Sequence, residues 1–462
     1  VVLIAFFSLV SSKPVEVEVA EGEYIVIAWN DLGMHCSNKD FSTMAVLPPY
    51  NNLKAQVVKR GAGGIYPEII TSGVKVTYEI PGNTYSVGKT NFWDFAFKLF
   101  NVTLAPNVGL KGAGLSGEMT LDAASGDHYK VEGIPVTPYT DADLTNEDPY
   151  QLALVKVYDM DGKLLATTRP VIPVSNEISC VSSGCHNSEQ EILNSHPKEG
   201  GFNASNKPIL CASCHASNAL GTIGSKEAGA FSMRIHSKHS EKTNDCYKCH
   251  PGPKTKCFRD VMFSKGKVCS DCHGTMSQIA SSIEQGRRPW LDEPSCDKPG
   301  CHAVKFAVNV GKLYRESRGH GGMFCSACHG SPHAIYTSTN PRDNQQMVDL
   351  QGHSGKLKEC WVCHGLTPLG NGPHGYRPVS VNDEKENNGI EIYPNPVSDF
   401  IYILYPDSHS KIEIFSFNGN KMKIGNPKYN ADFTEAKFNI SELPKGIYII
   451  KIGLRTAKFV KL

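Results

Sequence analysis

The pattern of hydrophobic and polar residues divides the chain into two strand-rich stretches separated by a long segment with neither the strand nor the helix period. Three runs rich in β-branched and aromatic residues are typical of strands: EYIVIAW (23–29), KAQVV (54–58) and VKVTYEI (74–80). Residues 152–171 predict a hairpin that turns near Asp161-Gly162, and residues 91–100 predict a short helix. We therefore predict a β-rich, sandwich-like domain over residues 21–175.

The strand pattern returns near the C-terminus. Residues 379–389 are polar and predict a linker, and residues 390–462 predict a small all-β sandwich. Its expected strands are FIYILYP (400–406), KIEIFSF (411–417), GIYIIKI (446–452) and AKFVKL (457–462). The FNGNK stretch supplies a turn between two of these strands.

Residues 176–378 lack long apolar runs and are dominated by Gly, Ser, Lys, Cys and His. Such a segment cannot bury enough apolar surface by itself to offset the entropy that its chain loses on folding. We expect short helices, little other regular structure, and a core formed by something other than side chains. The fold class predicted for the whole chain is therefore mixed.

Residues 1–20 begin with an apolar run of about ten residues that is followed by small residues. The run is too short to span a bilayer and suits the hydrophobic region of a secretory signal, although a buried first strand is an alternative. No other apolar stretch is long enough to span a membrane, so we expect a soluble, exported mature protein. The formal net charge of +1 does not suggest a nucleic-acid partner.

The sixteen cysteines are unevenly placed, since fifteen of them lie between Cys180 and Cys363. The pattern C-x-x-C-H occurs five times: Cys211/Cys214/His215, Cys246/Cys249/His250, Cys269/Cys272/His273, Cys325/Cys328/His329 and Cys360/Cys363/His364. Two further copies have a longer spacer: Cys180/Cys185/His186 and Cys296/Cys301/His302. C-x-x-C-H is the attachment signature of c-type haem, in which two thiols bind the porphyrin and the histidine binds its iron. Zinc knuckles and disulfide frameworks do not require a histidine directly after every second cysteine.

On these motifs the chain resembles multihaem c-type cytochromes, with seven sites in residues 180–364. The resemblance implies seven covalently attached haems, each held by a cysteine pair and an adjoining histidine. The porphyrins would then form the core that the middle segment lacks.

Seven other histidines lie in the middle segment: His196, His236, His239, His320, His333, His353 and His374. Seven irons need seven further axial ligands, so the match predicts two histidines for every iron. We expect His320 and His333 to serve haems other than the one attached at Cys325 and Cys328. A methionine such as Met233 or Met323 is the alternative ligand.

His236 and His239 have helical i, i+3 spacing, so both can face haems from one short helix.

An iron with two histidine ligands has no open position for a substrate, so this ligation predicts an electron carrier rather than an enzyme. The alternative is a multihaem oxidoreductase that acts on a small nitrogen or sulfur compound at one five-coordinate haem. That alternative requires one of the seven additional histidines not to be a ligand. Other redox proteins or extracellular acceptors are the expected partners, and assembly of the chain with itself into a filament stays open.

The C-terminal stretch resembles a type IX secretion sorting domain. The matching pieces are IYPNPVSD (392–399), IFSFNGNKM (414–422), ISELPKGIYIIKI (440–452) and the basic ending AKFVKL. This resemblance implies passage through the periplasm, recognition by the type IX secretion machinery, and a final location outside the cell or at its surface.

Residues 30–58 resemble a segment that precedes the haem region in some multihaem cytochromes, for which we infer no activity. Within it, His35 is expected to be a hydrogen-bonded structural histidine rather than a metal ligand.

Fourteen haem thioethers leave two cysteines, Cys36 and Cys257. Exported proteins pass through an oxidising compartment, where an even remainder usually pairs. We therefore predict a Cys36–Cys257 disulfide; two separate free thiols and an intermolecular bridge are the alternatives.

Overall fold

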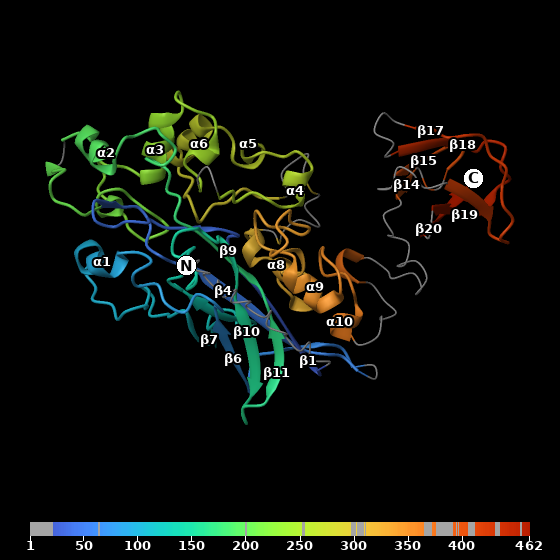
Figure 1. Ribbon diagram of the computed structural model, residues 1–462, viewed down its shortest axis with the longest axis horizontal. Coiled ribbons are helices and arrows are strands. Elements are labelled where there is room, and N and C mark those ends of the chain that lie inside the picture. The colour runs from blue at the N-terminus through green and yellow to red at the C-terminus, as the bar shows by residue number, and fades with distance from the viewer. Residues whose placement is uncertain are drawn as a thin grey trace, which may run out of the picture. The chain divides into compact units, whose positions relative to one another are not determined.

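The computed structural model describes most of the chain in two compact units, one up to Pro368 and one from Leu369 (Figure 1). The described residues are 22–62, 65–198, 201–251, 255–296, 302, 309, 311–364, 372–375, 391–393, 395, 397–404, 412–429, 435–452 and 455–462. The predicted signal segment (1–20) and linker (379–389) lie outside these residues. Each unit is described by itself below.

The first unit is built on an eight-stranded antiparallel sheet. Its strands run in the order β1 (Tyr24–Trp29), β4 (Asn52–Lys59), β8 (Tyr129–Glu132), β7 (Ser116–Leu121), β6 (Val74–Glu79), β10 (Leu154–Asp159) and β11 (Leu164–Thr168), and β5 (Glu68–Ile70) pairs with β4. The terminal strands β1 and β11 also contact each other, so the sheet curls towards a barrel. Buried apolar residues such as Val26, Leu53 and Val155 fill its interior.

The strands, the hairpin and the helix predicted for this region are all confirmed. The β10–β11 hairpin turns at Gly162, whose φ of 86° is the left-handed conformation that glycine adopts without strain. Helix α1 (Phe92–Phe100) buries Phe92, Ala96 and Leu99 in a separate apolar cluster with Phe41. Small pairings complete the unit: β2 (His35–Cys36), β12 (Val171–Ser175) and β9 (Tyr150–Leu152) form one sheet, and β3 (Met44–Ala45) pairs with β13 (Ile209–Leu210).

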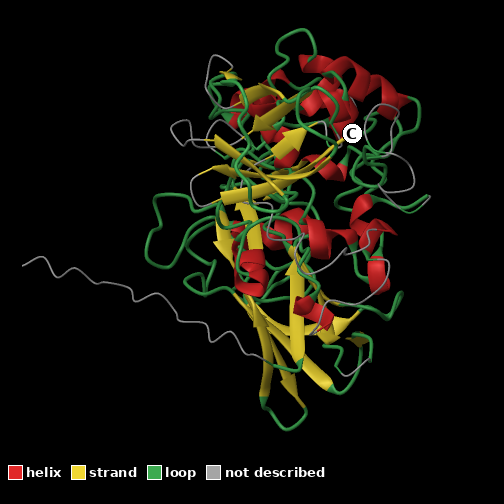
Figure 2. Cartoon of the chain, turned by 90° about the vertical axis from the view of Figure 1, so that its right-hand side faces the viewer, coloured by secondary structure: helices red, strands yellow, loops and turns green. Residues whose placement is uncertain are grey.

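The segment that carries the cysteine motifs folds into short helices joined by long loops, labelled α2 to α10 in Figure 1; Figure 2 colours the helices of the chain red and its loops green. The helices are α2 (Glu189–Ser195), α3 (Phe231–His239), α4 (Val261–Ser264), α5 (Cys269–His273), α6 (Met276–Glu284), α8 (Cys325–His329), α9 (Gln345–Gln351) and α10 (Trp361–His364). Short 3-10 turns are η2 (Cys211–Ser213), η3 (Cys246–Lys248), η4 (Tyr314–Glu316), η5 (His320–Gly322) and η6 (Pro373–Gly375). Among the described residues between 176 and 322, none is a buried member of the four apolar clusters of the protein.

The end of this segment packs on the curled sheet. Ile25, Ile27 and Trp29 of β1 form one apolar cluster with Phe324 and Met347, which lie at the start of α8 and within α9. Figure 1 shows α8, α9 and α10 along this side of β1. The sheet therefore supplies an apolar support to the part of the motif segment that is nearest to it.

The second unit has two sheets around one apolar core. One sheet has the order β14 (Glu391–Tyr393), β15 (Phe400–Leu404), β18 (Glu435–Asn439) and β17 (Lys428–Tyr429), and the other has β16 (Ile412–Ser416), β19 (Gly446–Ile452) and β20 (Arg455–Lys461). The core joins Ile401 and Phe438 of the first sheet to Ile450 and Phe459 of the second. The predicted strands are confirmed, and so is the turn in FNGNK, where Gly419 has a φ of 83°.

Candidate haem sites

The cysteine motifs form tight turns that bring the histidine back to the first cysteine. The amide of His250 donates to the Cys246 carbonyl at 2.8 Å, and the same bond closes the motifs of His215 and His364. In the longer motifs the amides of His186 and His302 donate to the carbonyls of Cys180 and Cys296 at 3.2 Å. The longer spacer therefore closes the same ring around a wider turn.

The second cysteine of three motifs lies at the surface of the protein. Cys185, Cys214 and Cys272 are exposed, whereas the first cysteines of the same motifs are half-buried. The reason is local, because this part of the chain contributes no buried member to an apolar cluster that could cover them. The sulfur atoms of Cys185 and Cys214 lie 3.6 and 3.8 Å from the hydroxyls of Ser183 and Ser213.

The exposure of these thiols does not remove them from the predicted sites. A thioether forms at the edge of a porphyrin, so its sulfur must reach that edge but need not be enclosed by side chains. Cys301, the second cysteine of one longer motif, lies outside the described residues. The thioethers predicted for all fourteen motif cysteines, Cys301 among them, stay predictions.

Five motif histidines each lie beside one of the seven additional histidines. The pairs and the separations of their ring centroids are His186–His239 (6.2 Å), His215–His196 (6.1 Å), His250–His236 (5.9 Å), His273–His333 (6.0 Å) and His364–His320 (5.9 Å). Every pair joins the histidine of one motif to a histidine that belongs to no motif. His320 and His333 lie beside motif histidines other than His329.

The spacing within these pairs fits a metal between two imidazoles. Metal–nitrogen bonds of about 2 Å on either side of an ion place the two ring centres roughly 6 Å apart. Direct stacking is closer, as His196 on Phe202 shows with a centroid separation of 4.1 Å. The planes of the paired rings cross at angles from 13° to 80°, which axial ligation permits because each ring can rotate about its metal–nitrogen bond.

Hydrogen bonds at Nδ1 leave the other ring nitrogen available in several of these histidines. The Nδ1 atoms lie next to carbonyl oxygens: His196 with Pro197 (2.9 Å), His215 with Gly229 (3.2 Å), His236 with Ser232 (2.7 Å) and His239 with Ile235 (2.9 Å). A carbonyl only accepts, so Nδ1 carries the proton and Nε2 keeps its lone pair for a metal. The sequence does not reveal these acceptors, because they are backbone atoms. The exceptions are the carbonyls of Ser232 and Ile235, which lie four residues before His236 and His239 in α3, as helical spacing predicts.

Helix α3 contributes to two pairs at once. His236 faces His250, and His239, three residues later, faces His186. The predicted short helix with both histidines is confirmed.

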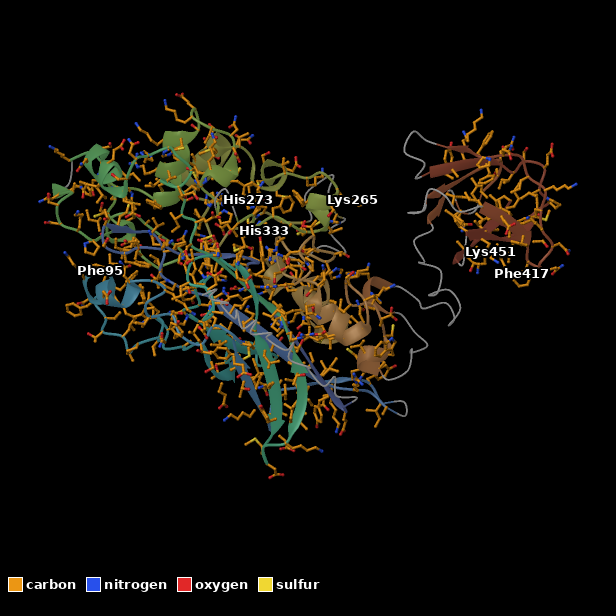
Figure 3. The ribbon with its side chains drawn as sticks, viewed as in Figure 1. Phe95, Lys265, His273, His333, Phe417 and Lys451 are labelled. Atoms are coloured by element: carbon orange, nitrogen blue, oxygen red, sulfur yellow. The ribbon has the colours of Figure 1, made fainter. Side chains whose placement is uncertain are left out.

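His333 and His273 are labelled next to each other in Figure 3; His273 is the last residue of α5, and His333 follows α8. Burial, with the nearby His273 and Arg259, lowers the pKa of His333 to about 4. Burial, with the nearby His236 and His273, likewise lowers the pKa of His250 to about 4. Both rings are therefore neutral near pH 7, which is the form that binds a metal.

Thiols from different motifs lie close together. A hydrogen bond from Cys269 lowers the pKa of Cys246 to about 6, so the third and fourth motifs are in contact. Burial raises the pKa of Cys328 to about 12, and the nearby Cys363 adds to this shift. The motifs form neighbouring sites rather than isolated ones.

The five pairs do not assign His302, His329, His353 and His374, whose roles as ligands stay predictions. His353 lies in another environment, with Nδ1 2.8 Å from the Ser354 carbonyl and Nε2 3.0 Å from Glu359 Oε1. Of the two methionines considered as ligands, Met323 packs against the apolar cluster on β1.

His35 has the structural role predicted for it, since its Nε2 lies 3.1 Å from Asp31 Oδ1 in a buried site. The predicted Cys36–Cys257 disulfide is wrong: both residues are free thiols in the structure. Burial raises the pKa of Cys36 to about 12, with further contributions from Cys257 and Glu177. The two cysteines are electrostatic neighbours, and Arg259 holds their segments together by donating to the carbonyls of Gly33 and Cys257.

Comparisons with known proteins inform mainly the second unit. No curated protein matches the chain. The solved structure described as "Crystal structure of the outer membrane decaheme cytochrome OmcA" is 11% identical to this chain, with a TM-score of 0.14. The match covers 94% of this chain and 66% of that one, and its TM-score is too low to support a common fold.

Among the described residues, no helix has the length and apolarity needed to cross a bilayer. Residues 391–461 match the family described as "Secretion system C-terminal sorting domain". The predicted sorting domain is thereby confirmed, and it indicates a protein that is exported to the cell surface or beyond it.

Proposed function

We propose that this chain is an exported heptahaem c-type cytochrome that carries electrons along haems held by pairs of histidines. The observation that carries the proposal is the set of five histidine pairs, because each joins a C-x-x-C-H or C-x4-C-H histidine to a second imidazole at about the separation that one metal ion requires. The motifs alone predict only one ligand for each iron.

In this proposal the haem irons supply one-electron chemistry, and the protein determines what can reach them. The cysteines of each motif hold the porphyrin covalently, and the motif histidine binds from one face. A second histidine would hold each of five irons. The pairs of motif histidine and second histidine would be His186 with His239, His215 with His196, His250 with His236, His273 with His333, and His364 with His320. With both axial positions filled by side chains, a substrate has no position at these irons.

The sorting domain supports a location where such electrons are exchanged with partners outside the cell. Other redox proteins or extracellular acceptors are the proposed partners, together with the type IX secretion machinery. Deletion of residues 390–462 is expected to leave a haem-loaded protein in the periplasm. Normal surface display of the deleted form would contradict this route.

The decisive experiment combines intact mass with electron paramagnetic resonance. The native protein is expected to carry seven haem masses, with its ferric haems low-spin because each has two nitrogen ligands. His333→Ala is expected to convert about one seventh of the haem signal to high-spin, since one axial ligand of one haem is lost. His128→Ala is the control, because that buried histidine lies outside the pairs and hydrogen-bonds Asp127 instead. A His333→Ala spectrum identical to the native one would exclude His333 as a ligand.

The surroundings of His353 support the alternative function, a multihaem oxidoreductase with one five-coordinate haem. Both ring nitrogens of His353 already lie within hydrogen-bonding distance of other groups. If His353 is not a ligand, one haem is five-coordinate and can act on a small nitrogen or sulfur compound. In that case the native protein has a high-spin signal and binds carbon monoxide when reduced, and His353→Ala changes neither property. If all haems are low-spin and His353→Ala creates a high-spin signal, the electron-carrier proposal holds.

A further inference from the structure

The N-terminal sheet reaches one of the candidate haem sites through a single loop, residues 30–33 (Asn-Asp-Leu-Gly). This loop lies against residues 331–333, which follow the sixth motif and end at His333. The Ser331 hydroxyl donates to the Asn30 carbonyl at 2.5 Å, and the Leu32 backbone lies within reach of the His333 ring. Two consecutive parts of one loop therefore hold the segment that presents His333 to His273.

The contact is so close that only glycine fits at residue 33. A Cβ on Gly33 would lie 1.8 Å from the Pro332 carbonyl oxygen, and the residue has a φ of +75°. The Gly33 carbonyl also accepts from Arg259 Nη1 at 2.9 Å, and Arg259 is held by two hydrogen bonds of 2.7 Å to Asp343. Loop 30–33 thus has well-defined contacts on both sides.

Hydrogen bonds within the N-terminal region fix the conformation of loop 30–33 independently of its contact with residues 331–333. The Asn30 side-chain oxygen accepts from the amides of Leu32 (3.1 Å) and Gly33 (2.7 Å), and its nitrogen donates to the Asn52 carbonyl on β4 at 2.9 Å. These bonds fix the direction of the Leu32 carbonyl relative to the sheet.

The backbone of His333 is constrained as well. Its φ of 63° is unusual for a residue with a side chain, and its carbonyl accepts from the Arg259 amide at 3.0 Å. Such a conformation persists only where the surroundings impose it. The constraints place the ring centroid 6.0 Å from that of His273.

We propose that loop 30–33 positions the His333 imidazole for its iron, so that the N-terminal sheet is a working part of the haem site attached at Cys269 and Cys272. The inference rests on the proposed function. An acceptor for the second ring N–H fixes a histidine ligand in one tautomer and orientation and makes it more basic, and loss of such a partner typically weakens ligation about 10–100-fold. Leu32, Gly33 and Ser331 are therefore positioning residues, which act on the iron only through His333.

The test compares Gly33→Ala with Gly82→Ala in the full, haem-loaded chain. Gly82 has a φ of +77°, and a Cβ there would meet no atom within 4 Å, so this control carries the same backbone strain without the collision. Gly33→Ala is expected to change about one seventh of the low-spin ferric signal, to shift the reduction potential of that one haem, and to let carbon monoxide bind it. Gly82→Ala is expected to leave all three readouts as in the native protein, with seven haems in both variants by mass. Native spectra and potentials in Gly33→Ala would overturn the inference.

Ser331→Ala is the milder variant and keeps the test valid if Gly33→Ala does not fold. It is expected to shift the potential of the same haem, and Ser331→Thr, which keeps the hydroxyl, is expected to restore it. Equal potentials in both Ser331 variants and the native protein would overturn the inference. His333→Ala distinguishes the role of His333 as a ligand from the positioning role of the loop. If this variant creates no high-spin haem, His333 is not a ligand. If it creates one while Gly33→Ala and Ser331→Ala are silent, only the positioning role fails.

Discussion

The curled sheet and the motif segment lie in one unit and are stabilised in different ways. In the sheet, side chains such as Val26, Leu53 and Val155 are fully shielded from water by one another. From 176 to 322 the described residues contribute no buried member to any apolar cluster, and histidine pairs lie about 6 Å apart instead. The first region can therefore fold on its own residues, whereas the second depends on bound groups and on the neighbouring sheet.

The largest effect is expected when the haems are withheld. A chain produced without haem attachment loses the groups that would fill the motif segment, so proteolytic cuts should concentrate between residues 180 and 320. The strands of the curled sheet should stay protected, because their apolar core is made of side chains. Limited proteolysis followed by mass spectrometry of haem-free and haem-loaded protein measures this. Equal protection of both regions in the haem-free chain would remove the distinction drawn here.

The next effect concerns a buried ion pair of the motif segment, which lies where that segment meets loop 30–33. Arg259 and Asp343 form a bidentate pair whose side chains are 5% and 1% exposed, and Arg259 also reaches the Gly33 carbonyl. Arg259→Gln leaves the Asp343 charge buried without its partner, so we expect a loss of about 3–5 kcal/mol in unfolding free energy.

Arg342→Gln is the matched control, because the Arg342–Asp148 pair, which connects the motif segment to the N-terminal region, is 48% and 30% exposed. Its loss is expected to cost about 0–1 kcal/mol. Chemical denaturation followed by far-ultraviolet circular dichroism gives both values. Similar losses in the two variants would show that burial does not make the Arg259–Asp343 pair more important to stability than the exposed pair.

Sequence reasoning succeeded where the signal is local. The cysteine motifs are contiguous in the chain, and α1, the β10–β11 hairpin and the C-terminal strands follow from patterns a few residues long. The pairing of His236 and His239 with two different motifs was foreseeable in part, because both lie on one helix.

What the sequence did not reveal depends on contacts between distant segments. His333 lies beside His273 because loop 30–33, nearly three hundred residues earlier in the chain, fixes its ring through backbone atoms. Every residue has a backbone carbonyl, so the residue types in a sequence do not show which carbonyl contacts a given side chain. Counting cysteines identified Cys36 and Cys257 as neighbours, but the structure does not bond the two thiols to each other.

The smallest effect concerns the Asp31 carboxylate in loop 30–33 and its contribution to the free energy of unfolding. Burial by itself would raise the pKa of Asp31, but hydrogen bonds and charge from His35, with a hydrogen bond from Asn52 at 3.0 Å, lower it from 3.8 to about 2. A group whose pKa is lowered on folding stabilises the fold at any pH above its unfolded pKa, and this stabilisation is lost as the pH falls through the folded value. Asp31→Asn is therefore expected to destabilise the protein by on the order of 2 kcal/mol at pH 7, and the difference from the native protein should shrink between about pH 4 and pH 2. Denaturation of both proteins across this range measures the difference, with the exposed Asp161→Asn in the β10–β11 turn as the control. A difference that stays constant from pH 7 to pH 2 would show that the carboxylate charge contributes nothing, and that the amide acts only by disturbing the contacts of His35 and Asn52.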